Sequence, residues 1–110
     1  MPTSSQATCS PKLFQQINVG RMTLHHRVVL APLTRFRIDA EHIPLLPIVS
    51  EYYAQRGSSP GTLLIAEAML VAPQAGGHNR FPGIWSDAQI AAWKKVLRVH
   101  AGDANGKLTL

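Results

Sequence analysis

Residues 28–33 read Val28-Val29-Leu30-Ala31-Pro32-Leu33, an unbroken apolar run that begins with two β-branched residues. A run of this length without polar alternation is typical of a strand covered on both faces, as in a parallel sheet. Proline has no backbone N–H to donate to a neighbouring strand, so Pro32 is expected at the carboxyl end of the run. The stretch therefore predicts a central strand of an α/β fold.

A second strand of the same kind is predicted for residues 62–71, which read Thr-Leu-Leu-Ile-Ala-Glu-Ala-Met-Leu-Val. Helices are predicted at 47–57 and 86–102, each ending on a glycine, the second opened by a capping box of Ser86 and Gln89. Strands that alternate with helices in this way indicate βα units with right-handed crossovers and a parallel sheet.

The flanking segments and the spacing of the strands indicate which α/β fold this is. A small hairpin is predicted around Gly20, and residues 107–110 predict the start of a third strand. The two strand starts lie about 34 residues apart, close to the roughly 31 per unit of an eightfold barrel of about 250 residues. Two strands and two helices cannot cover both strand faces, so the chain is expected to be the N-terminal, incomplete portion of a TIM (β/α)8 barrel.

Composition excludes several classes of protein. The 110 residues are 45% apolar with a net charge of +5, and the basic residues form no cluster, so no nucleic-acid partner is expected. Cys9 is the only cysteine, which excludes an intrachain disulfide and a zinc site built on cysteines. No stretch is long and apolar enough to span a bilayer, and no signal peptide is found. The expected location is cytoplasmic.

Five segments, in order along the chain, resemble the old yellow enzyme family of FMN-dependent oxidoreductases, most closely its fungal members. They are Leu13-Phe14 with Val19-Gly20; Arg27 to Arg35; Tyr52 to Arg56; Leu64 to Ala68; and Pro82 to Ser86 with Gln89 and Trp93-Lys94. A single match of this kind carries little weight, whereas five in the family's order are specific. The chain is therefore expected to consist of a disordered tail over residues 1–12 and a partial barrel segment over residues 13–110.

The resemblance implies a TIM barrel that binds FMN at the carboxyl ends of its strands. It implies hydride transfer from NAD(P)H to the C=C bond of a small α,β-unsaturated carbonyl compound. On the matching positions, Pro32, Leu33 and Thr34 would lie against the flavin, and the Thr34 hydroxyl would tune its reduction potential. Ala68 matches a small residue beside the cofactor, where a bulky side chain would displace the ring system.

After His100 the sequence departs from the family pattern. The family's third strand carries a glutamine that reaches the flavin, and residues 101–110 contain none. The carbonyl-binding histidine pair, the proton-donating tyrosine and the phosphate-binding loops belong further along such a barrel, so no catalytic residue is assigned here. The chain is expected to be truncated, inactive alone and prone to self-association through open sheet edges. The alternative is a non-catalytic remnant or a small α/β association module.

Two residues have competing interpretations. The Thr34 hydroxyl either faces a cofactor or satisfies a backbone group at the end of its strand, and the family resemblance favours the cofactor. Glu67 lies among apolar residues and is either a general base with a raised pKa or a buried acceptor that holds a neighbouring loop or arginine. The second interpretation is favoured, because the family places its proton chemistry on a later strand.

Loop residues offer weaker signals. His78 follows Gly76-Gly77 in the loop after the second strand, where it is a candidate for the edge of a substrate pocket and otherwise an exposed loop histidine. Arg35 and Arg37 are expected to be solvated loop charges. The histidines show no metal-ligand spacing, so no metal site is expected.

Overall fold

The computed structural model describes residues 10–102 and 106–109. Its elements are η1 (Lys12–Phe14), β1 (Ile17–Val19), β2 (Met22–Leu24), β3 (Val29–Leu30), α2 (Ile48–Arg56), β4 (Thr62–Ile65), η2 (Pro73–Ala75), α3 (Asp87–Gly102) and β5 (Gly106–Thr109). This order confirms the hairpin, the βα units and the third strand. Residues 1–9 of the predicted tail lie outside the described part, and Lys12 already belongs to η1.

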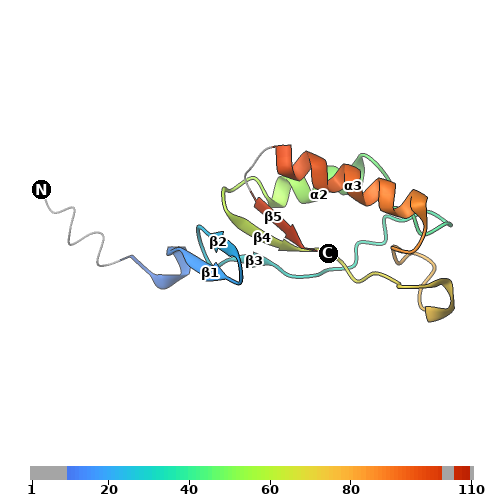
Figure 1. The fold of residues 1–110 in the computed structure, drawn as a ribbon, viewed down its shortest axis with the longest axis horizontal. Coiled ribbons are helices and arrows are strands. Elements are labelled where there is room, and N and C mark those ends of the chain that lie inside the picture. Colours follow the sequence, from blue (N-terminus) through green and yellow to red (C-terminus); the bar gives the residue numbers. More distant parts are fainter. Residues whose placement is uncertain (1–9, 103–105, 110) are drawn as a thin grey trace, which may run out of the picture.

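A parallel sheet forms the centre of the fold. β4 is its middle strand, with β3 on one side and β5 on the other. Val29 is paired with Leu63 and Leu30 with Leu64, which fixes the register of β3 on β4. Figure 1 shows α2 and α3 side by side over one face of this sheet. The hairpin lies at one end of the molecule, and the loops after β3 and β4 lie at the other (Figure 1).

Both predicted strands are longer than the observed ones. The run at 28–33 pairs only over Val29–Leu30, and the run at 62–71 only over Thr62–Ile65. Pro32 has no N–H to extend the ladder, as expected for the end of a strand. Beyond Ile65 the chain leaves the sheet, and Leu70 makes an isolated parallel bridge to Gly83 instead. Apolar composition extended both predictions past the residues that pair.

The helix boundaries agree with the sequence signals. α2 begins directly after Pro47 and is followed by Gly57, whose N–H donates to the carbonyl of Tyr53. The predicted capping box at the start of α3 is present. The backbone N–H of Gln89 donates to Ser86 Oγ at 3.2 Å, and Ser86 N–H donates back to Gln89 Oε1 at 3.0 Å. Two backbone donors at the helix start are thereby satisfied.

The hydrophobic core lies between the two helices and the helix-facing side of the sheet. Its buried members are Val49, Tyr52, Tyr53, Leu64, Ala66, Trp93 and Val96. Leu30 and Met69 pack against this cluster, so Leu30 belongs to the covered face of the sheet. In contrast, Val28 is 50% exposed and Val29 38% exposed. The exposure of Val29 in β3 agrees with the expectation that two helices cannot cover both faces of the strands in this chain.

The hairpin is attached to the amino-terminal end of the sheet. Gly20 adopts a φ of +57° in the turn between β1 and β2, a conformation that favours glycine. Val28 N–H donates to His26 Nδ1, so the His26 ring donates through Nε2 to Thr62 Oγ1 at 2.8 Å. This chain of bonds connects the segment after β2 to β4. Among the described residues, none of the helices has the length and apolar character needed to cross a bilayer.

Candidate functional site

The carboxyl ends of β3 and β4 bring the predicted cofactor residues together. Val29 pairs with Leu63 and Leu30 with Leu64, and Thr34 and Ala68 each follow the second of these pairs by four residues. The segments that follow β3 and β4 also meet beyond the sheet, because Arg35 N–H donates to Glu67 Oε2 at 3.3 Å. The residues after the two strands therefore lie side by side.

The surface at these strand ends is mostly apolar. Pro32, Leu33 and Ala68 are exposed and Thr34 is half-buried. Within residues 10–102 and 106–109 the Thr34 hydroxyl makes no hydrogen bond, while the Thr34 carbonyl accepts one from Arg35 Nε at 3.1 Å. A hydroxyl that does not satisfy the protein's own backbone remains available to a ligand. An apolar surface that carries a hydroxyl with no partner among the described residues suits the face of a planar, partly polar ring system.

The buried side chain of Glu67 connects the segments that form the site. Its carboxylate accepts the N–H of Arg35 and the hydroxyl of Tyr53, while its own N–H donates to Tyr53 Oη at 3.1 Å. Burial raises the pKa of the Glu67 carboxyl above its usual range, and the hydrogen bond from Arg35 N–H offsets part of the effect. Burial also raises the pKa of the Tyr53 phenol. Glu67 is thus the structural acceptor that the sequence favours, and it joins α2 to both strand ends.

The raised pKa of Glu67 predicts a specific pH dependence of stability. A carboxyl with a higher pKa in the folded than in the unfolded chain binds more protons when folded, so stability falls as pH rises through the folded pKa. Glu67→Gln is therefore expected to match the original chain at low pH and to unfold at a higher temperature than it above that window. Thermal unfolding followed by circular dichroism across the acid-to-neutral range measures this.

Glu51→Gln makes the same change at an exposed position of α2 and serves as the matched control. A difference between Glu67→Gln and the original chain that is constant across pH would contradict the prediction, because it would show no ionisation of Glu67 coupled to folding.

His78 lies in an aromatic group formed by the two loops. Its exposed ring stacks on Phe81 with centroids 5.8 Å apart and meets Phe36 edge-on at 5.1 Å. Phe36 is 49% exposed and has a φ of +59°, which is rare for an aromatic residue. The sequence contains no signal for this conformation, so Phe36 is a site residue that sequence reasoning missed. No hydrogen bond or ring contact joins this group to Thr34 or Ala68 within the described residues.

Hydrogen bonds between the loops fix this group in place. His42 Nδ1 lies 2.7 Å from the carbonyl of Phe81, and Gly83 N–H donates to the carbonyl of His42 at 2.9 Å. Arg80 Nη1 donates to the carbonyl of Ile38 at 3.2 Å. The loops after β3 and β4 therefore behave as one unit. Across the residues that are described, no three acidic, histidine or cysteine side chains are grouped as metal ligands.

Comparison with known proteins identifies the family of this chain. The sequence pattern of the "NADH:flavin oxidoreductase / NADH oxidase family" matches residues 12–108. The chain belongs to this flavin oxidoreductase family. It is 56% identical over 91 residues to chanoclavine-I aldehyde reductase fgaOx3 of Penicillium roqueforti, covering 82% of this chain and 24% of that protein. It is 52% identical over 93 residues to the "probable inactive dehydrogenase easA" of Claviceps fusiformis, covering 84% of this chain and 24% of the relative.

Solved structures give the same assignment for the fold. Morphinone reductase in complex with tetrahydroNAD superposes with a TM-score of 0.81 at 40% identity, over 92% of this chain and 26% of that one. Old yellow enzyme from Pichia sp. AKU4542 superposes with a TM-score of 0.81 at 36% identity, over 88% of this chain and 25% of that one. This flavin oxidoreductase chain is therefore the partial barrel that the sequence predicts, and it spans about a quarter of the length of its relatives.

Proposed function

We propose that this chain forms the first part of the cofactor surface of an FMN-dependent NAD(P)H oxidoreductase. The substrate class is a small α,β-unsaturated carbonyl compound, and the reaction is reduction of its C=C bond. Pro32, Leu33, Thr34 and Ala68 are the cofactor-facing residues, and His78 stands at the rim on the substrate side.

One observation carries the proposal: Thr34 and the exposed Ala68 follow the carboxyl ends of two parallel strands, and the segments after these strands are joined by the hydrogen bond from Arg35 N–H to Glu67 Oε2. Cofactors in such barrels bind at this end of the strands. The methyl group of Ala68 leaves room for a ring system, so the residues present fit a flavin. The family's chemistry and the names of the reductases among the relatives support the same assignment.

The residues of this chain bind and orient. FMN, when bound, supplies a hydride taken from NAD(P)H to the activated alkene. Pro32 and Leu33 offer apolar surface that excludes water from one side of the ring, and the Thr34 hydroxyl is positioned to donate a hydrogen bond to a carbonyl oxygen there. Glu67 fixes the two strand ends relative to each other through Arg35 N–H. A rigid support of this kind is what a site needs to hold a polar contact at constant geometry.

A chimaera tests the proposal. The matched 91 residues of this chain replace their counterparts in the Penicillium roqueforti reductase. The chimaera is expected to purify with FMN and to oxidise NAD(P)H in the presence of an α,β-unsaturated aldehyde. In it, Thr34→Val is expected to slow cofactor reduction about tenfold, the loss of one hydrogen bond to a group whose charge changes in the reaction. Stopped-flow flavin absorbance measures the rate.

Two further variants of the chimaera sharpen the result. Thr23→Val makes the same chemical change on the exposed hairpin, where Thr23 Oγ1 bonds Asn18, and is expected to leave the rate unchanged. Ala68→Trp is expected to abolish FMN retention by filling the cofactor's place. A folded chimaera without FMN, or one that keeps FMN with Trp at position 68, would refute the assignment of these residues.

A second candidate function is a non-catalytic association module. Two of the relatives named "probable inactive", 52% and 51% identical to this chain, and the uncovered apolar residues of β3 favour it. The chimaera distinguishes the two, because an association module has no reason to preserve a cofactor surface that restores reduction in a foreign barrel.

A further inference from the structure

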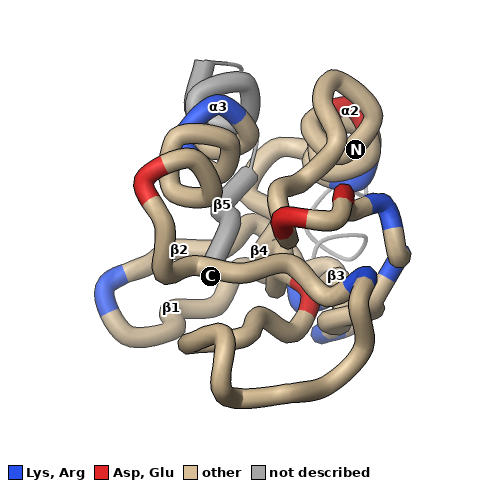
Figure 2. Tube along the Cα trace, turned by 90° about the vertical axis from the view of Figure 1, so that its right-hand side faces the viewer, with Lys and Arg blue, Asp and Glu red and all other residues tan. Residues whose placement is uncertain are grey.

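A surface cavity of about 290 Å³ lies beside α2, formed by the helix and the loop after β3. Residues at positions 48, 51, 52, 55 and 56 have the i, i+3, i+4, i+7, i+8 spacing of one helix face. This face lines one side of the cavity, and the loop contributes Arg35 and Arg37. Figure 2 shows several basic segments on the side of the molecule that carries α2.

Two guanidinium groups share one aromatic surface in this cavity. The guanidinium carbon of Arg56 lies 4.3 Å from the centroid of the Tyr52 ring, and that of Arg37 lies 5.8 Å from the same centroid. Tyr52 is itself buried in the core cluster, so its ring is a fixed base for both cations. Cation–π contact holds guanidinium groups in place while leaving their in-plane N–H donors free for a ligand.

The hydrogen bonds of these arginines go to neutral oxygens. Arg56 Nη1 donates to Gln55 Oε1 at 3.0 Å, and Arg35 Nε donates to the carbonyl of Thr34. Arginine carries five N–H donors, so most donors of the cluster have no partner among the described residues. Glu51 is the one carboxylate on the cavity wall, against three guanidinium groups. Glu67 does not line the cavity; its carboxyl, whose pKa burial raises, accepts a hydrogen bond from the backbone N–H of Arg35.

We propose that this cavity binds a phosphate group. Three cations and one carboxylate leave an excess of about two positive charges, which matches the roughly −1.5 to −2 of a phosphate ester at neutral pH. Guanidinium groups recognise phosphate oxygens through pairs of parallel N–H donors. The cavity shares no lining residue with the strand-end surface of Pro32, Leu33, Thr34 and Ala68, so the inference goes beyond the proposed function.

Equilibrium dialysis of the 110-residue chain against radiolabelled inorganic phosphate tests the proposal, and it reads binding whatever the state of association. Saturable binding of one phosphate per chain is expected. Arg37→Gln and Arg56→Gln are each expected to weaken it about tenfold, the loss of a charge-assisted hydrogen bond. Glu51→Gln is expected to strengthen binding, because it removes the only carboxylate on the wall.

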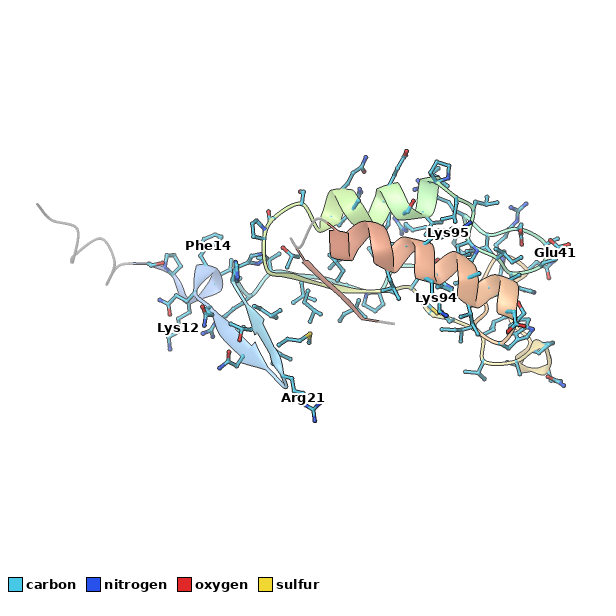
Figure 3. The ribbon with its side chains drawn as sticks, turned by 45° about the horizontal axis from the view of Figure 1, so that its top comes forward. Lys12, Phe14, Arg21, Glu41, Lys94 and Lys95 are labelled. Atoms are coloured by element: carbon cyan, nitrogen blue, oxygen red, sulfur yellow. The ribbon has the colours of Figure 1, made fainter. Side chains whose placement is uncertain are left out.

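Arg21→Gln is the matched control, since it makes the same change in charge at the tip of the hairpin, away from the helices (Figure 3). It is expected to leave binding unchanged. If Arg56→Gln loses helical circular dichroism, the phosphate affinities of Arg37→Gln and Glu51→Gln test the proposal instead. Binding that is absent, that Arg21→Gln weakens equally, or that Glu51→Gln weakens would overturn the proposal.

The same dialysis against adenosine monophosphate separates two sources of the phosphate group. Affinity equal to that for inorganic phosphate indicates that the phosphate alone is recognised, and tighter binding indicates a nucleotide; both support a phosphate site. If neither inorganic phosphate nor adenosine monophosphate binds, the phosphate site is refuted. The proposed function is not affected by that result, because it depends on Thr34 and Ala68.

Discussion

The 110-residue polypeptide expressed by itself is expected to purify without FMN and to leave NAD(P)H unoxidised. Barrels of this class hold a cofactor phosphate with loops after the seventh and eighth strands. The chain spans about a quarter of its relatives and contains three parallel strands among the described residues. In the proposed site, Pro32, Leu33, Thr34 and Ala68 would contact only one face of the flavin ring, which supplies too little buried area to retain a ligand through purification. The visible absorbance spectrum and an NAD(P)H oxidation assay measure the outcome.

The chimaera with the Penicillium roqueforti reductase is the control, because it presents the same residues within a closed barrel. Flavin in the chimaera and none in the short chain would show that the surface is intact but insufficient. A yellow short chain with one FMN per polypeptide would contradict the prediction, and would mean that several copies together enclose the cofactor.

The sequence predicts the order of the elements better than their length. The helix boundaries depend on local signals, and Pro47, Gly57 and the Ser86–Gln89 pair all act where expected. Strand length depends on which partner lies alongside. Residues 28–33 and 62–71 have the composition of long buried strands because the closed barrel of the relatives provides neighbours for them. With one neighbour described, β3 pairs over two residues.

The candidate site was predicted in part, and the reason differs for each residue. The position of Glu67 among apolar residues left two interpretations open, and the structural one was favoured because the family places its proton chemistry on a later strand; the structure shows the Glu67 carboxylate accepting hydrogen bonds from Arg35 N–H and the Tyr53 hydroxyl. Thr34 and Ala68 came from the family resemblance, and their assignment to a flavin stays a prediction. His78 was expected to edge a substrate pocket, and the structure shows an exposed ring packed on Phe36 and Phe81.

Two features lay beyond sequence reasoning. Arg35 and Arg37 were interpreted as solvated loop charges; they are exposed, yet they share a cavity wall with Arg56, which is about twenty residues away in sequence. Only the packing of the β3–α2 loop against α2 brings them together. The positive φ of Phe36 likewise has no signal in the sequence, because no glycine or asparagine marks the position.

The uncovered apolar residues of the first barrel strand have consequences for association. Val28, Val29, Leu33 and Phe36 follow one another along the segment that contains β3, and each is between 38% and 50% exposed. β3 is also an edge of the described sheet, with backbone N–H and C=O groups that have no strand partner on one side within the described residues. Apolar patches on monomeric proteins rarely exceed a few hundred Å², and open strand edges pair readily with other chains.

The short chain is therefore expected to retain helical circular dichroism, to bind a hydrophobic dye strongly and to elute larger than its 12.0 kDa monomer.

Val29→Ser combined with Leu33→Ser is expected to reduce dye binding and shift elution toward the monomer, because both changes make the uncovered surface polar while leaving the core cluster intact. Val71→Ser is the matched control, since Val71 is 75% exposed but lies outside the sheet. A monomeric original chain with little dye binding would rule out association through this surface. Equal effects of Val71→Ser and the paired change would show that general hydrophobicity, and not the β3 segment, drives association. Incorporation of the same segment into the chimaera's closed barrel should remove both dye binding and association, since closure covers the side chains and leaves no edge.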